Sequence, residues 1–387
     1  MKKVLHYSPD LALGGIARTA VDVAVAMQAG KLAENTVLAP GGAAVSVFNA
    51  YAIPLRRARR LSFFNRMSEQ KRLRRVVATL QPDVLLAYGF QAARLAVQAC
   101  RRMEEGKRPR IIALLAAPLH SWFAAGTLRG CDAVAAISRH LRNTLDTKEL
   151  RPVLSKEKLW VIPYGVDGAL VYPHYKVSEE WQQSWQKVFP DFRKTLSLCI
   201  PGSLTPARGL ESMPELLHLL EKQGVKADIY LPGRAEDAAY ARQIEKHFRR
   251  AGVGERLHMV PAALAKDMRE VLCSCDITLA PAPQPVTYDR AVLEALALGR
   301  PVAGYEHGAV GEYLNAFLPE GRVPVGKLEA LADTLVQWNA YRPDMPDTTP
   351  YPYRITDTAF SLSKLSDMLL NAQMPTNPAS SRSVPLS

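Results

Sequence analysis

Two segments of the sequence combine residue types that suit a phosphate or a diphosphate. In one, Gly14 and Gly15 follow an expected strand and open an expected helix, whose free amides and positive dipole end favour an anion. In the other, PGSLTPARG (201–209), Gly202 permits close backbone approach, and the Arg208 guanidinium can stabilise the charge growing on a departing diphosphate. The alternatives are a tight turn at the glycine pair and an ordinary surface role for Arg208.

Carboxylates stand out in a further segment, residues 281–314. Asp289 can cap a helix that ends at Gly299, and Glu294 lies inside that helix among apolar neighbours. The Glu294 carboxylate either forms a structural ion pair or accepts two hydroxyl groups of a bound ribose. A second turn, residues 306–312, offers backbone amides at the start of the next helix.

These segments follow short apolar runs that alternate with stretches of helical periodicity, which is typical of parallel sheets covered by helices. The alternation occurs twice, and an aromatic, polar stretch to about Phe192 separates the two parts. The expected strands are 4–7, 83–88, 110–116 and 133–138 in the first part, and 196–204, 227–233, 257–261 and 276–281 in the second. We therefore predict an α/β protein with two doubly wound, Rossmann-like domains facing across a cleft, with the loops at the carboxyl ends of the strands lining it.

Length and composition agree with two domains and exclude several classes of protein. The chain has 387 residues, of which 48% are hydrophobic and 22% charged, as in ordinary globular proteins. It contains neither an apolar run of about 20 residues nor a signal-peptide core, so we expect a cytoplasmic protein. The five cysteines lack metal-ligand spacing and are expected to be core thiols. Because no two aspartates flank a single residue, we expect no metal cofactor.

The formal net charge is +12: residues 1–170 carry +14 (26 Lys and Arg against 12 Asp and Glu), and residues 171–387 carry −2 (23 against 25). Much of the positive charge is concentrated in residues 55–75. Apolar side chains, among them Phe63 and Phe64, are interleaved with these cations. Such a segment suits an anionic membrane surface, where each Lys or Arg contributes about 1 kcal/mol. Nucleic acid ranks lower, because zinc-finger, RNP-type and basic-zipper patterns are absent from the sequence. A solvated helix face without a partner is the remaining alternative.

In order and spacing, several motifs together make the chain resemble glycosyltransferase family 4, whose members are retaining transferases of the GT-B fold. The resemblance covers nearly the whole chain through GGIAR (14–18), PDVLLAYG (82–89), AAISRHLRNTL (135–145), VIPYGVD (161–167), PGSLTPARG (201–209) and LEALALGRPVAG (293–304). It implies transfer of a sugar from a nucleotide-diphosphate donor, expected to be a UDP-sugar. The second domain would bind the donor and the first would hold the acceptor.

The resemblance also implies roles for single residues. Gly15 would lie near the donor phosphates, and Arg208 would take the place of the usual lysine beside the diphosphate. Glu294 would bind the ribose, and His120 would lie near the transferred sugar. The catalytic set is therefore Arg208, His120 and Glu294, and the donor-binding set is Gly14, Gly15, Gly202, Ser203, Arg208, Thr287, Tyr288, Asp289 and Glu294.

The sequence departs from the family pattern in three respects. Ser203 stands where the family commonly has an arginine, and Val286 stands where it has the first of two glutamates. Thr287-Tyr288-Asp289 replaces a Gly-Phe-Gly. Because the missing glutamate normally contacts the donor sugar, Asp289 or Gln284 is a candidate substitute.

The function expected first is a retaining glycosyltransferase of bacterial envelope synthesis, acting on a lipid-linked or lipopolysaccharide core acceptor at the inner face of the cytoplasmic membrane. A non-catalytic GT-B partner that binds a glycan or activates another transferase, and a nucleotide-sugar epimerase, are the alternatives. The expected domains are residues 1–168 (acceptor) and 169–355 (donor). They are followed by a helix, 356–374, packed back on the first domain, and a disordered tail, 375–387.

Overall fold

The computed structural model describes residues 1–9, 15–41, 45–119, 122–233, 237–345 and 353–371. The chain divides into two compact units, Met1–Asp167 with Tyr353–Ser387, and Gly168–Pro352. Gly14, His120 and the tail 375–387, to which the sequence assigns roles, lie outside the described residues. None of the helices formed by the described residues combines the length and apolarity of a bilayer-crossing segment.

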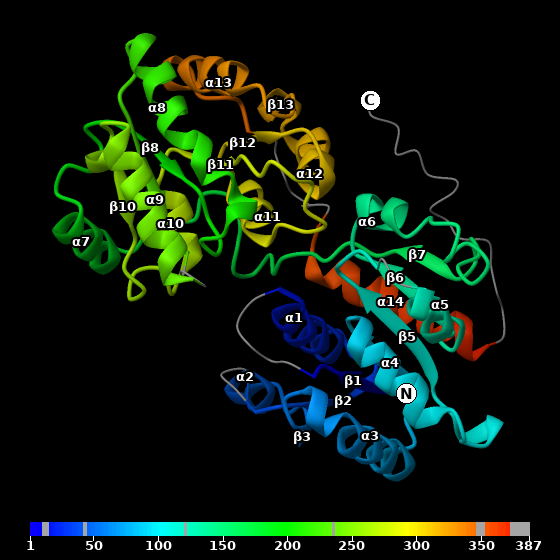
Figure 1. Cartoon of the computed structure of the whole chain (residues 1–387). Helices are drawn as coiled ribbons and strands as arrows, with labels where there is room; N and C mark the ends of the chain where they lie inside the picture. Colours follow the sequence, from blue (N-terminus) through cyan, green and yellow to red (C-terminus); the bar gives the residue numbers. More distant parts are fainter. Residues whose placement is uncertain (10–14, 42–44, 120–121, 234–236, 346–352, 372–387) are drawn as a thin grey trace. The chain divides into compact units, whose positions relative to one another are not determined.

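The first unit contains a parallel sheet of seven strands in the order β3-β2-β1-β4-β5-β6-β7 (Figure 1). Its inner strands are buried along almost their whole length, as expected of a parallel sheet between helices. The strands are β1 (Lys3–Tyr7), β2 (Glu34–Ala39), β3 (Leu55–Arg57), β4 (Val84–Tyr88), β5 (Arg110–Leu115), β6 (Ala133–Ala136) and β7 (Leu159–Val161). The α-helices are α1 (Gly15–Ala29), α2 (Val45–Ala50), α3 (Arg66–Leu80), α4 (Phe90–Cys100), α5 (Trp122–Arg129), α6 (Arg139–Thr144) and α14 (Ile355–Leu370).

The second unit contains a parallel sheet of six strands in the order β10-β9-β8-β11-β12-β13. The strands are β8 (Leu196–Cys199), β9 (Ala227–Leu231), β10 (Leu257–Met259), β11 (Ile277–Ala280), β12 (Val302–Tyr305) and β13 (Arg322–Val323). The α-helices are α7 (Glu179–Val188), α8 (Met213–Lys222), α9 (Ala238–Arg250), α10 (Met268–Ser274), α11 (Arg290–Ala297), α12 (Gly308–Phe317) and α13 (Leu328–Ala340). The predicted fold class, two doubly wound α/β domains, is confirmed.

The strand order reverses once in each sheet, between β1 and β4 in the first unit and between β8 and β11 in the second. In open parallel sheets, ligands bind beyond the carboxyl ends of the strands at such a reversal. The segment 201–209 follows β8, and the segment that begins at residue 281 follows β11. The topology of the second unit therefore brings the two predicted donor segments to the same place.

Helix α7 lies in the aromatic, polar stretch for which the sequence predicts no regular element. Ser178 caps its first turn by accepting a hydrogen bond from Trp181 N. Trp185, on the inner face of the helix, is 2% exposed and packs against Phe189 and Tyr230. One buried aromatic face thus ties the helix to the second unit.

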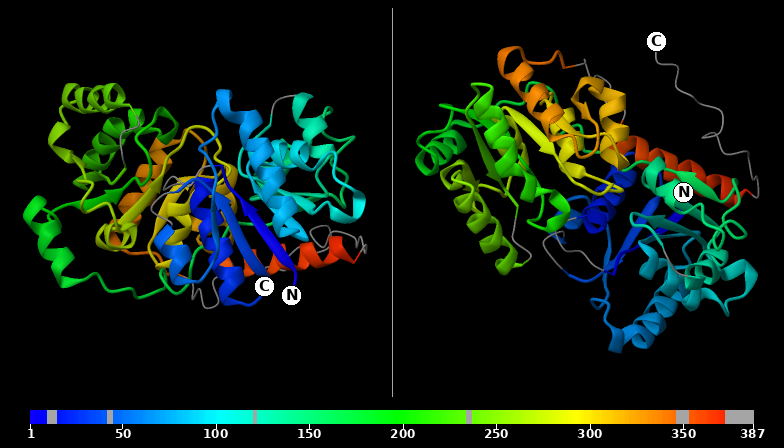
Figure 2. Two further views of the ribbon diagram at one scale, coloured as in Figure 1. Left: turned by 90° about the horizontal axis from the view of Figure 1, so that it is seen from below. Right: turned by 45° about the horizontal axis from the view of Figure 1, so that its top comes forward.

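The last described helix, α14, drawn in red in Figure 2, belongs to the first unit, in which it contacts α1 and β5. Lys2 Nζ, at the beginning of the chain, donates to Ser363 Oγ (2.8 Å) and to Asp367 Oδ1 (2.6 Å). The Thr358 hydroxyl accepts from Gly165 N (3.0 Å) and donates to Pro163 O (2.7 Å). The helix is therefore held on the first unit by its contact with α1 and by these hydrogen bonds.

Strand β1 carries a buried histidine network. His6 is 0% exposed, its Nε2 donates to Asn35 Oδ1 (3.0 Å), and its Nδ1 accepts from the Tyr88 hydroxyl (2.9 Å). Burial lowers the pKa of His6 from 6.5 to about 4, against an opposing effect of the Asn35 hydrogen bond. The imidazole is therefore neutral at physiological pH.

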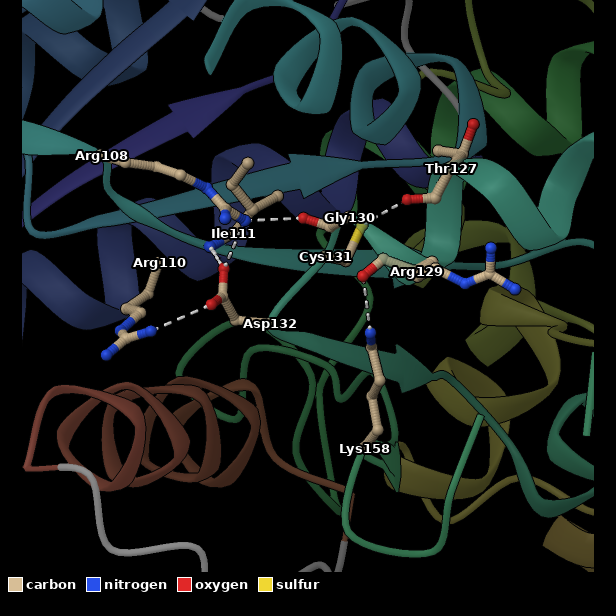
Figure 3. A network of polar contacts seen from close by, with 9 residues as sticks. All are labelled: Arg108, Arg110, Ile111, Thr127, Arg129, Gly130, Cys131, Asp132 and Lys158. Atoms are coloured by element: carbon tan, nitrogen blue, oxygen red, sulfur yellow. Dashed lines mark hydrogen bonds and ion pairs between the residues drawn. The ribbon is translucent and has the colours of Figure 1, made fainter. Parts of the chain in front are cut away.

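A polar network closes the amino ends of β5 and β6 (Figure 3). Asp132 Oδ2 accepts from Ile111 N (2.8 Å) and from Arg108 Nη2 (3.2 Å), and Asp132 Oδ1 accepts from Arg110 Nη1 (3.2 Å). Arg108 also donates to Gly130 O (2.7 Å). Several cations of the basic first unit are thus used to hold strand ends together.

Candidate functional site

The loop after β8 brings Arg208 against the backbone of Gly202. Gly202 has φ +108°, which other residues rarely adopt, and a Cβ at this position would overlap the Arg208 guanidinium. A Cβ at Gly233, after β9, would in turn overlap the Gly202 carbonyl oxygen. The two loops thus pack backbone against backbone, and the guanidinium lies where a side chain at 202 would stand.

Asp289 fixes the other side of this guanidinium. Arg208 Nη1 donates to Asp289 Oδ2 (2.6 Å), while Asp289 Oδ1 accepts from Val292 N (3.3 Å) and so caps α11. The Asp289 side chain is 5% exposed and that of Arg208 is 28% exposed. Within the described residues, the remaining N–H groups of the Arg208 guanidinium have no hydrogen-bond acceptor. Arg208 is therefore held through one nitrogen, with further donors available for a ligand.

The segment between β11 and α11 is held from both sides. Gly209, at φ +71°, packs so closely on Pro281 that a Cβ would overlap the Pro281 carbonyl oxygen. On the other side, His307 Nε2 donates to Ala282 O (2.9 Å), and Ala309 N donates to Val286 O (2.8 Å). The loop that carries the predicted Thr287, Tyr288 and Asp289 is thus fixed between the loop after β8 and the start of α12.

Glu294 lies on α11, and its Oε1 accepts from Arg290 Nε (2.7 Å). The Glu294 side chain is 13% exposed and that of Arg290 is 23% exposed. The pair has the i,i+4 spacing of neighbours on one helix face. The structural ion pair weighed for Glu294 is therefore present, so a ribose would share this carboxylate with Arg290.

In the first unit, the corresponding end of the sheet holds two buried polar groups. Gly15 begins α1, the first helix after β1. Tyr7 ends β1, and its hydroxyl and Glu69 Oε1 are buried without a hydrogen-bond partner among the described residues. Burial raises the pKa of Glu69, and burial followed by the charge of Glu69 raises that of Tyr7.

Of the predicted site residues, the structure brings Gly202, Arg208 and Asp289 into contact. Ser203, Thr287 and Tyr288 lie partly exposed on the same two loops, and Glu294 lies on the helix that Asp289 begins. Among the described residues, no three His, Cys, Asp or Glu side chains are grouped as a metal site requires. The expectation that no metal is needed stays a prediction.

Two further residues of the site had no assigned role in the sequence. His307 fixes the loop after β11 through Ala282 O, and Arg290 pairs with Glu294. The i,i+4 spacing of Arg290 and Glu294 is a signal from which their pairing could have been predicted. For His307 we find no such signal, because its partner is a backbone oxygen 25 residues away.

The sequence of the chain matches models of two glycosyltransferase families. Residues 13–169 match the model described as Glycosyltransferase Family 4, and residues 196–339 match the model described as Glycosyl transferases group 1. The chain belongs to the glycosyltransferases. Its resemblance to family 4 is thereby confirmed, and the transferase has one matched region in each of its two units. No curated protein sequence matches this glycosyltransferase.

Solved structures show that the glycosyltransferase has the GT-B fold. The Anabaena protein HepE in complex with UDP and glucose is 17% identical, with a TM-score of 0.69, and the match covers 96% of this chain and 97% of that chain. A glycosyltransferase from Rickettsia africae is 14% identical, with a TM-score of 0.71 over 97% and 94% of the two chains. Sucrose-phosphate synthase from Thermosynechococcus elongatus is 14% identical, with a TM-score of 0.67 over 98% and 96%.

Proposed function

We propose that this glycosyltransferase transfers a sugar from a UDP-sugar to a lipid-linked or lipopolysaccharide core acceptor, with retention of configuration at the anomeric carbon. The observation that carries the proposal is the Arg208 guanidinium, held against Gly202 and paired with Asp289 at the reversal between β8 and β11. UDP or a UDP-sugar is bound in structures of HepE, a protein with the same fold.

In this proposal the diphosphate of the donor lies beside Arg208. When the bond between the anomeric carbon and the diphosphate oxygen breaks, negative charge grows on the departing UDP. A hydrogen-bonding group that is already in position, such as the Arg208 guanidinium, stabilises that charge without reorganisation. Such a well-placed group is worth about 3 kcal/mol. Asp289 is a positioning residue here, because its oxygens are engaged by Arg208 and by the start of α11.

The same contacts indicate which residue can take the place of the glutamate that the family has where this chain has Val286. Asp289 was a candidate substitute for it, but both Asp289 oxygens accept hydrogen bonds within the protein. Gln284 is exposed on the same loop, and within the described part of the chain its amide forms no hydrogen bond. We therefore assign the contact with the donor sugar to Gln284 rather than to Asp289.

The acceptor side of the proposal rests on the basic first unit. Residues 55–75 form β3, the 3-10 turn Phe63–Asn65 and the first part of α3. Most of the arginines in this segment are exposed, and so is Phe64. A membrane-borne acceptor with anionic groups suits this surface, which is the reason to place the enzyme peripherally on the inner face of the cytoplasmic membrane.

The test is an activity assay with UDP-sugars and lipid-linked glycan acceptors. Release of UDP that depends on the acceptor, with the same anomeric configuration in donor and product by NMR, is the expected result. Inversion of configuration, or transfer only from a donor with another base, would contradict the proposal.

A non-catalytic GT-B partner is the second candidate, and Val286 is the residue that favours it. The Val286 backbone oxygen accepts from Ala309 N (2.8 Å), and the apolar side chain at this position offers a sugar no hydrogen bond. Such a partner would release no UDP from any UDP-sugar, with or without acceptor, whereas the enzyme would. The same assay therefore separates the two candidates.

A further inference from the structure

A concave surface of the first unit lies between α3 and the carboxyl end of α4. The cavity has a volume of about 760 Å³. Gln70 Nε2, on α3, donates to Gln98 O, on α4, at 3.0 Å, which ties the two walls together. Five cations line the cavity, and none of the described lining residues is acidic: Arg66, Lys71 and Arg74 come from α3, and Arg101 and Arg102 follow the last turn of α4. We call this surface the α3–α4 groove.

Some basic residues of the first unit are balanced by a carboxylate, whereas, among the described residues, most cations of the groove are not. Arg72 pairs with Glu69 (3.5 Å) and Arg110 pairs with Asp132 (3.2 Å), so both are balanced by a carboxylate. In the described part of the chain, Lys71, Arg74, Arg101 and Arg102 form neither an ion pair nor a hydrogen bond through their side chains. Like charges gathered in one concavity without a counter-charge attract an anion from solution.

Apolar side chains lie at the same place. Met67 lines the groove and is 74% exposed, and Phe64, in the turn directly before α3, is 96% exposed. A free phosphate ion or a nucleic-acid backbone gains nothing from these side chains. A lipid does, because its phosphate can meet the cations while the exposed side chains enter the boundary between headgroups and acyl chains.

We propose that the α3–α4 groove binds the phosphate of an anionic lipid headgroup and so docks the first unit on a membrane. This rests on the proposed function in one respect, the membrane-borne acceptor. It adds Arg101 and Arg102, which lie outside the basic segment 55–75, and it localises the attraction in one concavity. Diffuse attraction would instead be shared by all the exposed cations of the first unit.

The experiment is flotation of the full chain with vesicles of phosphatidylcholine, with or without phosphatidylglycerol, for the wild type and three variants. Each variant replaces two adjacent arginines by glutamine, so that all three lose the same charge. Arg101→Gln with Arg102→Gln changes the groove, and Arg56→Gln with Arg57→Gln changes the basic segment outside the groove. Arg249→Gln with Arg250→Gln, at the end of α9 in the second unit, is the matched control.

We expect the wild type to bind only the vesicles that contain phosphatidylglycerol, and the groove variant to bind them at least about tenfold more weakly, given a contribution near fivefold per cation. The vesicle affinity of the α9 control should stay within about twofold of that of the wild type. The loss of vesicle affinity in the Arg56/Arg57 variant should be several-fold smaller than that in the groove variant. Thermal unfolding and UDP binding, measured on the same preparations, should not change.

Three results would overturn the proposal. One is the absence of vesicle binding by the wild type. Another is an equal loss of vesicle affinity in the groove variant and the Arg56/Arg57 variant, which would show that the membrane attracts all exposed cations of the first unit alike. The third is displacement of the vesicles by duplex DNA at equal phosphate concentration, which would assign the groove to nucleic acid. Because UDP binding is read separately, failure of the groove and failure of the proposed transferase activity are distinguishable.

Discussion

Arg208 and Asp289 lie 81 residues apart in the sequence and form a 2.6 Å ion pair between the loop after β8 and the first turn of α11. The pair couples three tasks: Asp289 begins the helix, orients the guanidinium and balances its charge. Because the carboxylate is 5% exposed, loss of either partner leaves a nearly buried charge or an unoriented cation. The donor site proposed here depends on this one contact.

Asp289→Asn should separate the capping role of this residue from its charge. An asparagine side chain can still cap α11, so the free energy of unfolding should fall by less than about 1 kcal/mol. The bond to Arg208 loses its ionic character, and UDP affinity should fall by about three- to tenfold. Urea unfolding and calorimetric titration with UDP measure the two effects. Tighter UDP binding by the variant would mean that the carboxylate competes with the diphosphate for Arg208.

Gly202→Ala should damage the donor site through the Arg208 side chain. The new Cβ would displace the guanidinium, so UDP affinity should fall at least about tenfold, a change of 1.4 kcal/mol. Gly224→Ala is the matched control, because Gly224 also has positive φ (+78°) but has open space around its would-be Cβ.

The control should lose about 1–2 kcal/mol of stability from backbone strain and keep its UDP affinity. Equal UDP affinities in the two variants, measured by calorimetry, would show that contact between Gly202 and Arg208 has no part in binding.

Because the pKa of the buried His6 is lowered, we expect the free energy of unfolding to depend on pH. The native pKa of about 4 lies below the ordinary value of 6.5, so between these values the unfolded chain binds a proton that the native protein excludes. The contribution of neutral His6 is therefore complete above pH 6.5 and falls as the pH drops towards 4, by about 3 kcal/mol in all.

The measurement is urea unfolding across this pH range for the wild type and for His6→Gln. The wild type should lose more stability on acidification than the variant, with the difference spread between pH 6.5 and about 4. Parallel pH profiles would contradict the assignment of a neutral, buried imidazole.

Thr358→Val should loosen α14 from the first unit. The valine has nearly the same shape but cannot accept from Gly165 N or donate to Pro163 O, so two backbone groups lose their partner. We expect a loss of about 1–3 kcal/mol, seen as a lower melting temperature. Thr358→Ser, which keeps the hydroxyl, should retain most of the stability. A serine variant as unstable as the valine variant would assign the effect to packing instead.

The fold could be predicted from the sequence because strands buried on both faces consist of short apolar runs, as in Val84–Tyr88 and Ile277–Ala280. Helix α7 was missed because one inward face of aromatic residues around Trp185 holds it, in a stretch that otherwise reads as polar. The segments that form the candidate site were singled out in the sequence one by one. The contact between Arg208 and Asp289 was not predicted, since it depends on β8 and β11 becoming neighbours although β9 and β10 come between them in the sequence.

The proposed donor site can be tested by calorimetric titration of the purified protein with UDP, and then with GDP and ADP, using Arg208→Ala for comparison. We predict that UDP binds, that the other two nucleotides bind more weakly, and that the variant loses at least about tenfold in UDP affinity, or 1.4 kcal/mol. Failure to bind any of the three nucleotides, or equal UDP affinity in the wild type and the variant, would contradict a donor site built on Arg208.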